Sequence, residues 1–244
     1  MRMRRPVVLG LLAAVLVSAG TCAFVTRPLA TRQGVDFQVT EYRIPAYVKA
    51  TDFVQRHFQY QLLASRICGG SASPRECVMA LLEWTRRTIP QTPVGWPVVD
   101  DHPLHIVIRG HGTDDQMADI FTTLAVYAGV PAFFRPISIP ERRVRLPLSF
   151  VQLDGRWIPI DVASQKTFTN RAGGLASVDE LLNDPDLVVG HAAGSDNGGL
   201  PYSAYINRAT LAPFVVPPTL RPSLQQPLPR LRYELRRAVG WERE

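Results

Sequence analysis

The sequence lacks a central basic patch with interleaved aromatic residues, although its formal net charge is +6. The positive charges are weighted toward the two ends of the chain, at Arg2, Arg4, Arg5, Arg230, Arg232, Arg236 and Arg237. Nucleic-acid-binding domains usually gather such charges on one face or along one helix. We therefore predict no nucleic-acid partner.

Internal repeats are also absent, and charged residues make up only 20% of the 244 residues, against 46% hydrophobic ones. This composition is typical of a globular protein and not of a disordered one. The length suits one domain with extensions. We predict an N-terminal segment over residues 1–27, a domain over residues 28–189, and a Gly/Pro-rich arm with a basic tail over residues 190–244.

The N-terminal segment contains an uncharged, almost wholly apolar run over residues 6–25, preceded by MRMRR. This pattern is typical of a secretion signal or a membrane anchor, and about 20 apolar residues suffice to span a bilayer. Cleavage after Ala19 or Ala23 and an uncleaved anchor both remain open. Either one predicts a protein of the bacterial inner membrane facing the periplasm, or one secreted to the periplasm or cell exterior.

Cysteine is scarce, and only Cys68 and Cys77 lie beyond the N-terminal segment. In an oxidising compartment their spacing favours a disulfide that closes a small loop. A catalytic thiol needs a histidine and a helix start beside it, whereas we expect Cys77 inside a helix and Cys68 in the loop before it. Structural cysteines are therefore the favoured interpretation.

Capping residues and apolar spacing indicate the elements of the domain. We expect a helix from Ser73 to about Arg87, and a strand over residues 132–139. We expect a hairpin over residues 148–161, because Asp154 and Gly155 separate two apolar alternations. A short helix should start at Ser177. Phe150 and Trp157, on the hairpin, are expected to pack against the central helix.

That central helix follows the stretch GHGTDDQMADIF, residues 110–121. Thr113 and Gln116 have the spacing of a capping box, and Asp114 and Asp115 fall in the first turn, where acids complement the helix dipole. Gly129-Val130-Pro131 ends the helix. The two acids are thus explained by helix stabilisation, with catalysis as the alternative.

The order of these parts resembles the bacterial transglutaminase-like superfamily, mainly over residues 112–132 and 153–161. The resemblance implies an α+β fold with a papain-like core, in which helices pack on a small antiparallel sheet. It also implies a cysteine, histidine and aspartate triad. Residue by residue, the cysteine position carries Asp114, the histidine position carries Leu146, and the aspartate is retained as Asp161. Residues 133–190 contain no histidine.

Two of the three triad residues are therefore replaced, which predicts a catalytically degenerate protein. We expect a binding or scaffolding module of the cell envelope, with an envelope protein or a polysaccharide as partner. It would contact the membrane through the N-terminal helix if that helix is uncleaved. No cofactor is predicted. The alternative is an unconventional or metal-assisted hydrolase of envelope peptide or glycan that uses His111, Asp114 and Asp115.

Several polar and aromatic residues beside the central helix are candidates for ligand binding. These candidates are His111, Asp114, Asp115, Arg142, Arg143 and Trp96. The arginines lie where the family's histidine strand begins, so they suit an anion in a former catalytic cleft. A metal ion held by His102, His105 and His111 is the less favoured alternative, because histidines in a polar loop are usually surface residues.

Overall fold

The computed structural model describes residues 5–35, 38–97, 100–139, 142, 144–189 and 200–240. The chain is α+β, with helices packed on small antiparallel sheets. Its contacts divide it into two units, residues 1–55 and residues 56–244, which are described in turn.

The first unit contains a helix and a hairpin. Helix α1 (Arg5–Thr26) is followed by the antiparallel strands β1 (Pro28–Val35) and β2 (Gln38–Pro45). Arg32 and Glu41 are cross-strand partners, and their side chains form an exposed ion pair of 3.2 Å. The unit ends within helix α2 (Ala46–Cys68), where the Lys49 ammonium donates to the carbonyl of Ala30.

Among the residues that the structure describes, no helix is long and apolar enough to cross a membrane. The apolar run predicted as a signal or anchor lies partly outside that description, which omits the side chains of residues 5–13 and 16.

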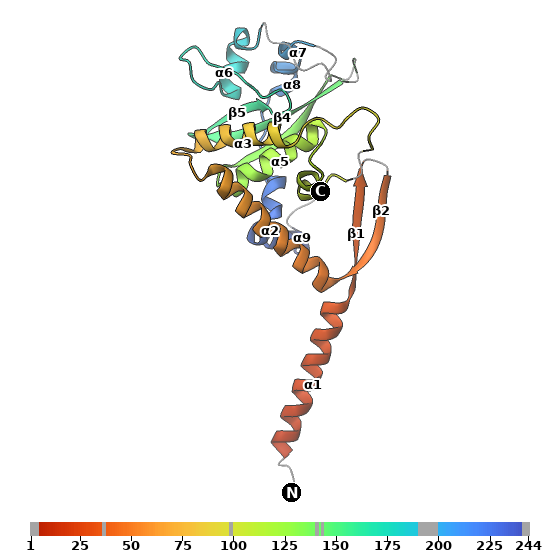
Figure 1. Cartoon of the computed structure of the whole chain (residues 1–244). Helices are drawn as coiled ribbons and strands as arrows, with labels where there is room; N and C mark the ends of the chain where they lie inside the picture. Colours follow the sequence, from red (N-terminus) through yellow and green to blue (C-terminus); the bar gives the residue numbers. More distant parts are fainter. Residues whose placement is uncertain are drawn as a thin grey trace. The chain divides into compact units, whose positions relative to one another are not determined.

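The second unit is built around a four-stranded sheet in the order β3-β4-β5-β6. Its strands are β3 (Ala132–Ile139), β4 (Val144–Leu153), β5 (Arg156–Asp161) and β6 (Lys166–Thr167). Helix α5 (Asp114–Tyr127) packs against β3 and β4, and helix α3 (Pro74–Thr88) packs against α5 (Figure 1). The short helix α4 (Pro103–Arg109) precedes α5.

One face of the sheet and α5 share a hydrophobic core, because alternate side chains of a strand point to opposite faces. Ala132, Val151, Ile158 and Ile160 contribute to this core from the strands, and Ile120, Phe121 and Leu124 contribute from α5. All seven are buried. The predicted strand 132–139 and the predicted hairpin are confirmed, and β4 begins earlier than expected.

The opposite face carries a second hydrophobic cluster, which corrects one expectation. Phe150 and Trp157 do not pack against α5 but lie in this second cluster, where Phe133 and Phe214 contact both of them. Their strand positions alternate with those that face α5, so the sheet itself separates them from the helix.

The described part of the predicted arm contributes to the second cluster. Tyr202, Tyr205, Ile206 and Leu211 are fully buried there. The arm forms α7 (Tyr202–Tyr205), α8 (Arg208–Leu211), η4 (Arg221–Gln225) and α9 (Pro227–Ala238), after α6 (Val178–Asn183) and η2 (Pro185–Leu187). Gly/Pro-rich composition predicted a linker or a wrapping arm, and these buried residues belong to the same unit as the sheet.

Cys68 and Cys77 form a disulfide, with their Cα atoms 4.8 Å apart. It joins the end of α2 to the first turns of α3, so that the turn over residues 69–73 is closed at both ends. A crosslink of this kind stabilises chiefly by restricting the unfolded chain.

Replacing both cysteines by alanine should lower the free energy of unfolding by about 2–3 kcal/mol, because the closed loop is short. Denaturant unfolding measures this change. The unsubstituted chain under reducing conditions is the matched control and should lose a similar amount. Equal stability of the oxidised and reduced forms would contradict the prediction.

Candidate functional site

The start of α5 is held by the side-chain amide of Gln116, which is buried. Its oxygen accepts hydrogen bonds from Arg109 Nη2 at 2.8 Å and from the Thr113 amide at 3.2 Å. Its nitrogen donates to the Asp100 carbonyl at 3.2 Å and to Asp101 Oδ1 at 2.7 Å. All four hydrogen bonds that a glutamine amide can make are therefore present. The capping box of Thr113 and Gln116 is confirmed.

Gly112 lies against this amide. A Cβ at Gly112 would approach Ile106 Cγ2 to 3.1 Å and Gln116 Oε1 to 3.3 Å, so any other residue would crowd the turn. Its carbonyl accepts from the amide of Thr92 at 2.9 Å, and its own amide donates to Pro90 at 3.1 Å. These bonds bring residues 90–92 beside the first turn of α5.

The two acids of the first turn have different partners. Asp114 accepts a hydrogen bond from the side-chain amide of Gln91. Asp115 accepts one from the Thr113 hydroxyl, and its Oδ1 also accepts from the Gln116 amide at 3.0 Å. Adjacent helical residues point about 100° apart. The carboxylates therefore do not converge as the pair in a glycoside hydrolase does.

Asp161, at the end of β5, is buried, and each of its carboxylate oxygens accepts a hydrogen bond. Its Oδ1 accepts from the Ser164 amide at 3.2 Å, and its Oδ2 accepts from the Tyr202 hydroxyl at 2.7 Å. Burial raises the pKa of Tyr202, and the carboxylates of Asp161 and Asp114 raise it further. The Tyr202 hydroxyl is thus protonated near neutral pH and donates to Asp161.

Sequence reasoning missed Tyr202 because it follows a Gly/Pro-rich stretch. The spacing of Tyr202, Tyr205 and Ile206 is the signal that predicts a buried helical face there. Leu146, in contrast, lies in the second hydrophobic cluster together with Tyr202 and is fully buried.

The three histidines proposed for a metal do not come together. The rings of His102 and His105 lie 5.1 Å apart, and His105 pairs with Asp100. His111 instead contacts Trp96, ring to ring at 5.3 Å, and its Nδ1 lies 3.1 Å from the Thr92 hydroxyl. Across the described ranges, no three His, Cys, Asp or Glu side chains are placed to hold a metal ion.

His102 has a structural role at the start of α4. Its Nδ1 accepts from the Leu104 amide at 3.3 Å, which requires the neutral ring. Burial lowers the pKa of His102 to about 4, and the charges of Arg56 and His105 add to the shift. The ring is therefore neutral near pH 7 and caps the helix.

The remaining ligand candidates are Trp96, which precedes α4, and Arg142 and Arg143, which follow β3 in the sequence. Trp96 is mostly exposed and touches only the His111 ring among the contacts above. Arg142 is exposed, and Arg143 lies outside the described residues. Other arginines, Arg135, Arg145 and Arg221, line a cavity that reaches Asp115.

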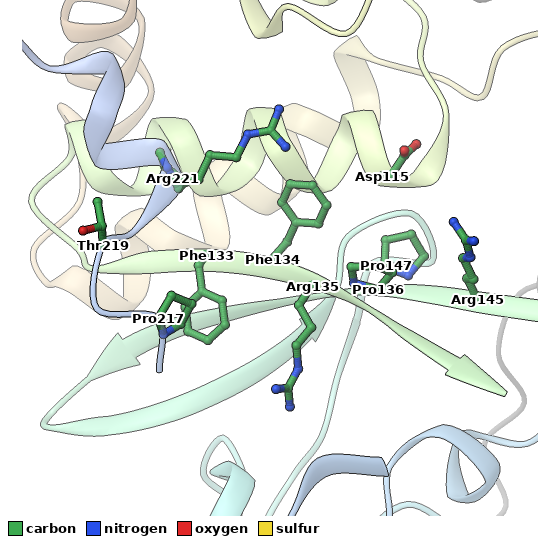
Figure 2. Close-up of a pocket in the computed structure, with 11 residues that line it drawn as sticks. Asp115, Phe133, Phe134, Arg135, Pro136, Arg145, Pro147, Pro217, Thr219 and Arg221 are labelled. Carbon is green, nitrogen blue, oxygen red and sulfur yellow. The ribbon is translucent and has the colours of Figure 1, made fainter. Parts of the chain in front are cut away.

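That cavity, of about 500 Å³, runs from the first turn of α5 to the arm. Asp115 lies at one end, β3 contributes four consecutive residues (133–136), and Pro217, Thr219, Arg221 and Pro222 close the other end. Figure 2 shows Phe134 and Arg135 pointing to opposite sides of β3. The cavity therefore borders both faces of the strand.

No family model matches this chain, and no curated protein matches it. Two solved structures are similar to it in part. One is a candidate cysteine protease from Cytophaga hutchinsonii, 14% identical, with a TM-score of 0.39 over 57% of this chain and 53% of that one. The other is a candidate protease from Parabacteroides distasonis, 12% identical, with a TM-score of 0.33 over 63% of this chain and 41% of that one. The match thus spans about half of those chains or less. Values this low assign neither a family nor an activity.

Asp119 is a further buried acid, one turn after Asp115 on α5. Burial raises its pKa from 3.8 to about 6, although Arg221, whose Nη2 lies 3.8 Å from Oδ2, opposes the shift. Asp101 and Asp115 raise the pKa further.

Because this pKa is higher in the folded state, stability is greatest while the acid is protonated in both states, and it falls as the pH rises from about 4 to about 6. The loss should be on the order of 2–3 kcal/mol. We expect Asp119→Asn to remove it, so the variant should gain this amount relative to the parent between pH 4 and pH 7. Unfolding at both pH values measures the gain. A difference that stays constant with pH would contradict the prediction.

Proposed function

We propose that this chain is a catalytically degenerate, transglutaminase-like protein of the bacterial cell envelope that acts as a binding module. The proposal rests on the resemblance that matches Asp114, Leu146 and Asp161 to the cysteine, histidine and aspartate of the family. A thiolate needs a neighbouring imidazole and an orienting carboxylate to attack an amide. This chain offers a carboxylate and an apolar side chain at the first two positions.

The observation that carries the proposal is the 2.7 Å hydrogen bond from Tyr202 to Asp161. The carboxylate that would orient a catalytic imidazole accepts a tyrosine hydroxyl instead. Since burial raises the pKa of that hydroxyl, it stays protonated and is no general base near neutral pH. Tyr202 comes from the arm, so the C-terminal part of the chain occupies the space beside the former triad.

The chemistry of Asp114 agrees with a non-catalytic role. A carboxylate that attacked an amide would form a mixed anhydride, which is less stable than the amide. At the start of α5 the same carboxylate complements the helix dipole, and the Gln91 amide donates to it. Its role in the proposal is to stabilise the helix.

Purified protein should therefore show no transglutaminase or amidase turnover with a glutamine-containing peptide and a primary amine. Asp114→Ala should leave that background unchanged and lower the free energy of unfolding by about 0.3–1 kcal/mol. Asp179→Ala, which removes an acid from the first turn of α6, is the matched control and should behave alike. Turnover that Asp114→Ala abolishes would overturn the proposal.

Three features support the envelope part of the proposal: the apolar run at residues 6–25, the disulfide, and the surface of α9. Four apolar side chains along α9 and at its C-cap, Leu228, Leu231, Leu235 and Val239, are 55–67% exposed. Their spacing of three and four residues places them on one side of the helix. Arg232 and Arg236 flank this stripe, while Glu234 is paired with Arg230 at 2.5 Å.

An exposed apolar stripe flanked by arginines suits the interface of an anionic membrane. With residues 1–27 removed, the protein should bind vesicles containing an equal mixture of phosphatidylcholine and phosphatidylglycerol more tightly than vesicles of phosphatidylcholine alone. Leu231→Ser with Leu235→Ser should weaken binding at least about tenfold. Phe58→Ser with Leu62→Ser removes exposed apolar side chains from α2 and is the control. Equal binding by both double variants would contradict this role of α9.

A further inference from the structure

The cavity beside β3 lies along the edge of the sheet. Strand β3 is the terminal strand in the order β3-β4-β5-β6, so only one of its sides is paired. Four consecutive residues of β3 line the cavity, although consecutive side chains point to opposite faces (Figure 2). A cavity that meets both faces of a strand meets its edge, where backbone donors and acceptors are presented.

The register shows which backbone groups point outward. Pro136 is opposite Pro147, and because neither has an N–H, this pair cannot exchange backbone hydrogen bonds. Pairs alternate along an antiparallel ladder, so Phe134 and Ser149 are also a pair without mutual bonds. The N–H and C=O of Phe134 and the C=O of Pro136 therefore point away from β4.

These outward groups lack partners within the described chain. No backbone or side-chain hydrogen bond joins Phe134 or Pro136 to the arm or to any other described segment outside the sheet. The arm approaches the cavity through Pro217 and Pro222, and proline has no N–H to donate to the strand. The arm thus lies beside the edge of β3 without pairing with its backbone. This allows another extended chain to pair with β3.

The cavity is also positively charged, with Arg135, Arg145 and Arg221 against Asp115. The guanidinium of Arg135 lies 5.7 Å and 5.6 Å from the ring centres of Phe150 and Phe214. Its Nη2 is buried and has no hydrogen-bond partner in the described part of the chain. A buried N–H group without an acceptor is costly, so an anion that reaches Nη2 would offset part of that cost.

We propose that this cavity binds an acidic peptide segment in extended conformation, which adds to the edge of β3 as a further strand. The peptide backbone bonds to Phe134 and Pro136, and its carboxylates face Arg145 and Arg135. The four lining residues of β3 correspond to about four residues of ligand. The inference rests on the proposed binding function and names its ligand class.

The probe is a fluorescent, end-blocked peptide whose central four residues are glutamate, compared with one whose central four residues are lysine. Consecutive glutamates of an extended chain point to opposite faces, so they can reach Arg145 on one face of the sheet and Arg135 on the other (Figure 2). We expect saturable binding of the acidic peptide alone, and affinity that falls with added salt. Arg145→Glu should weaken binding at least tenfold. Arg86→Glu changes the net charge equally on an exposed position of α3 and should leave binding unchanged. Denaturant unfolding of both variants verifies that they are folded.

Two further measurements test strand addition itself. The Phe134 amide should exchange its hydrogen more slowly when the peptide is bound, and N-methylation of the peptide backbone should abolish binding. The inference would be overturned if the two peptides bound equally or if neither bound. It would also be overturned if binding persisted after N-methylation of the peptide or in the Arg145→Glu variant. None of these binding results bears on whether the protein has amidase or transglutaminase activity. The non-catalytic proposal is therefore tested separately, by the Asp114→Ala assay.

Discussion

The buried amide of Gln116 is the interaction on which the site depends. Its oxygen and nitrogen join Arg109, Thr113, Asp100 and Asp101, so the end of α4 and three positions outside the helices are fixed to one residue of α5. A buried amide left unpaired costs about 1–3 kcal/mol, and here every bond is made. This network holds the first turn of α5, which carries Asp114 and Asp115. The network does not involve the side chain of Asp114, so it would hold the turn in the same way with a thiol at that position.

The parts of the fold that follow local rules could be predicted from the sequence. Ser73, Thr113 and Ser177 cap helices, and Asp154-Gly155 forms the hairpin turn, because each depends on residues within a few positions. The sequence did not predict that Phe150 and Trp157 lie on the face of the sheet opposite α5, because this depends on which face α5 covers. Composition indicated an arm, but it did not show that a few apolar residues among the glycines and prolines complete a core.

The position of the candidate site could be predicted from the sequence, but the residues that contact it could not. The acids at the start of α5 and the retained Asp161 follow from the resemblance and the turn pattern. Gln91, Tyr202 and Arg135 reach the site from distant segments, and no local spacing links them to it. Histidine clustering in the sequence was misleading for the same reason: His111 and the pair His102 and His105 have different neighbours once the loop is folded.

A helix start that favours a thiolate favours any anion, because the unpaired amides and the dipole do not distinguish sulfur from oxygen. Under the proposed correspondence, Asp114 in the place of the family's cysteine keeps the charge that the helix end prefers and offers no thiol nucleophile. Under the same correspondence, the buried carboxylate of Asp161 has no imidazole beside it, and the Tyr202 hydroxyl is its hydrogen-bond donor. Tyr202 comes from the arm, and the same arm borders the unpaired edge of β3. The hydrogen bond to Asp161 and the border of the cavity are thus two consequences of one packing arrangement of the arm on the sheet.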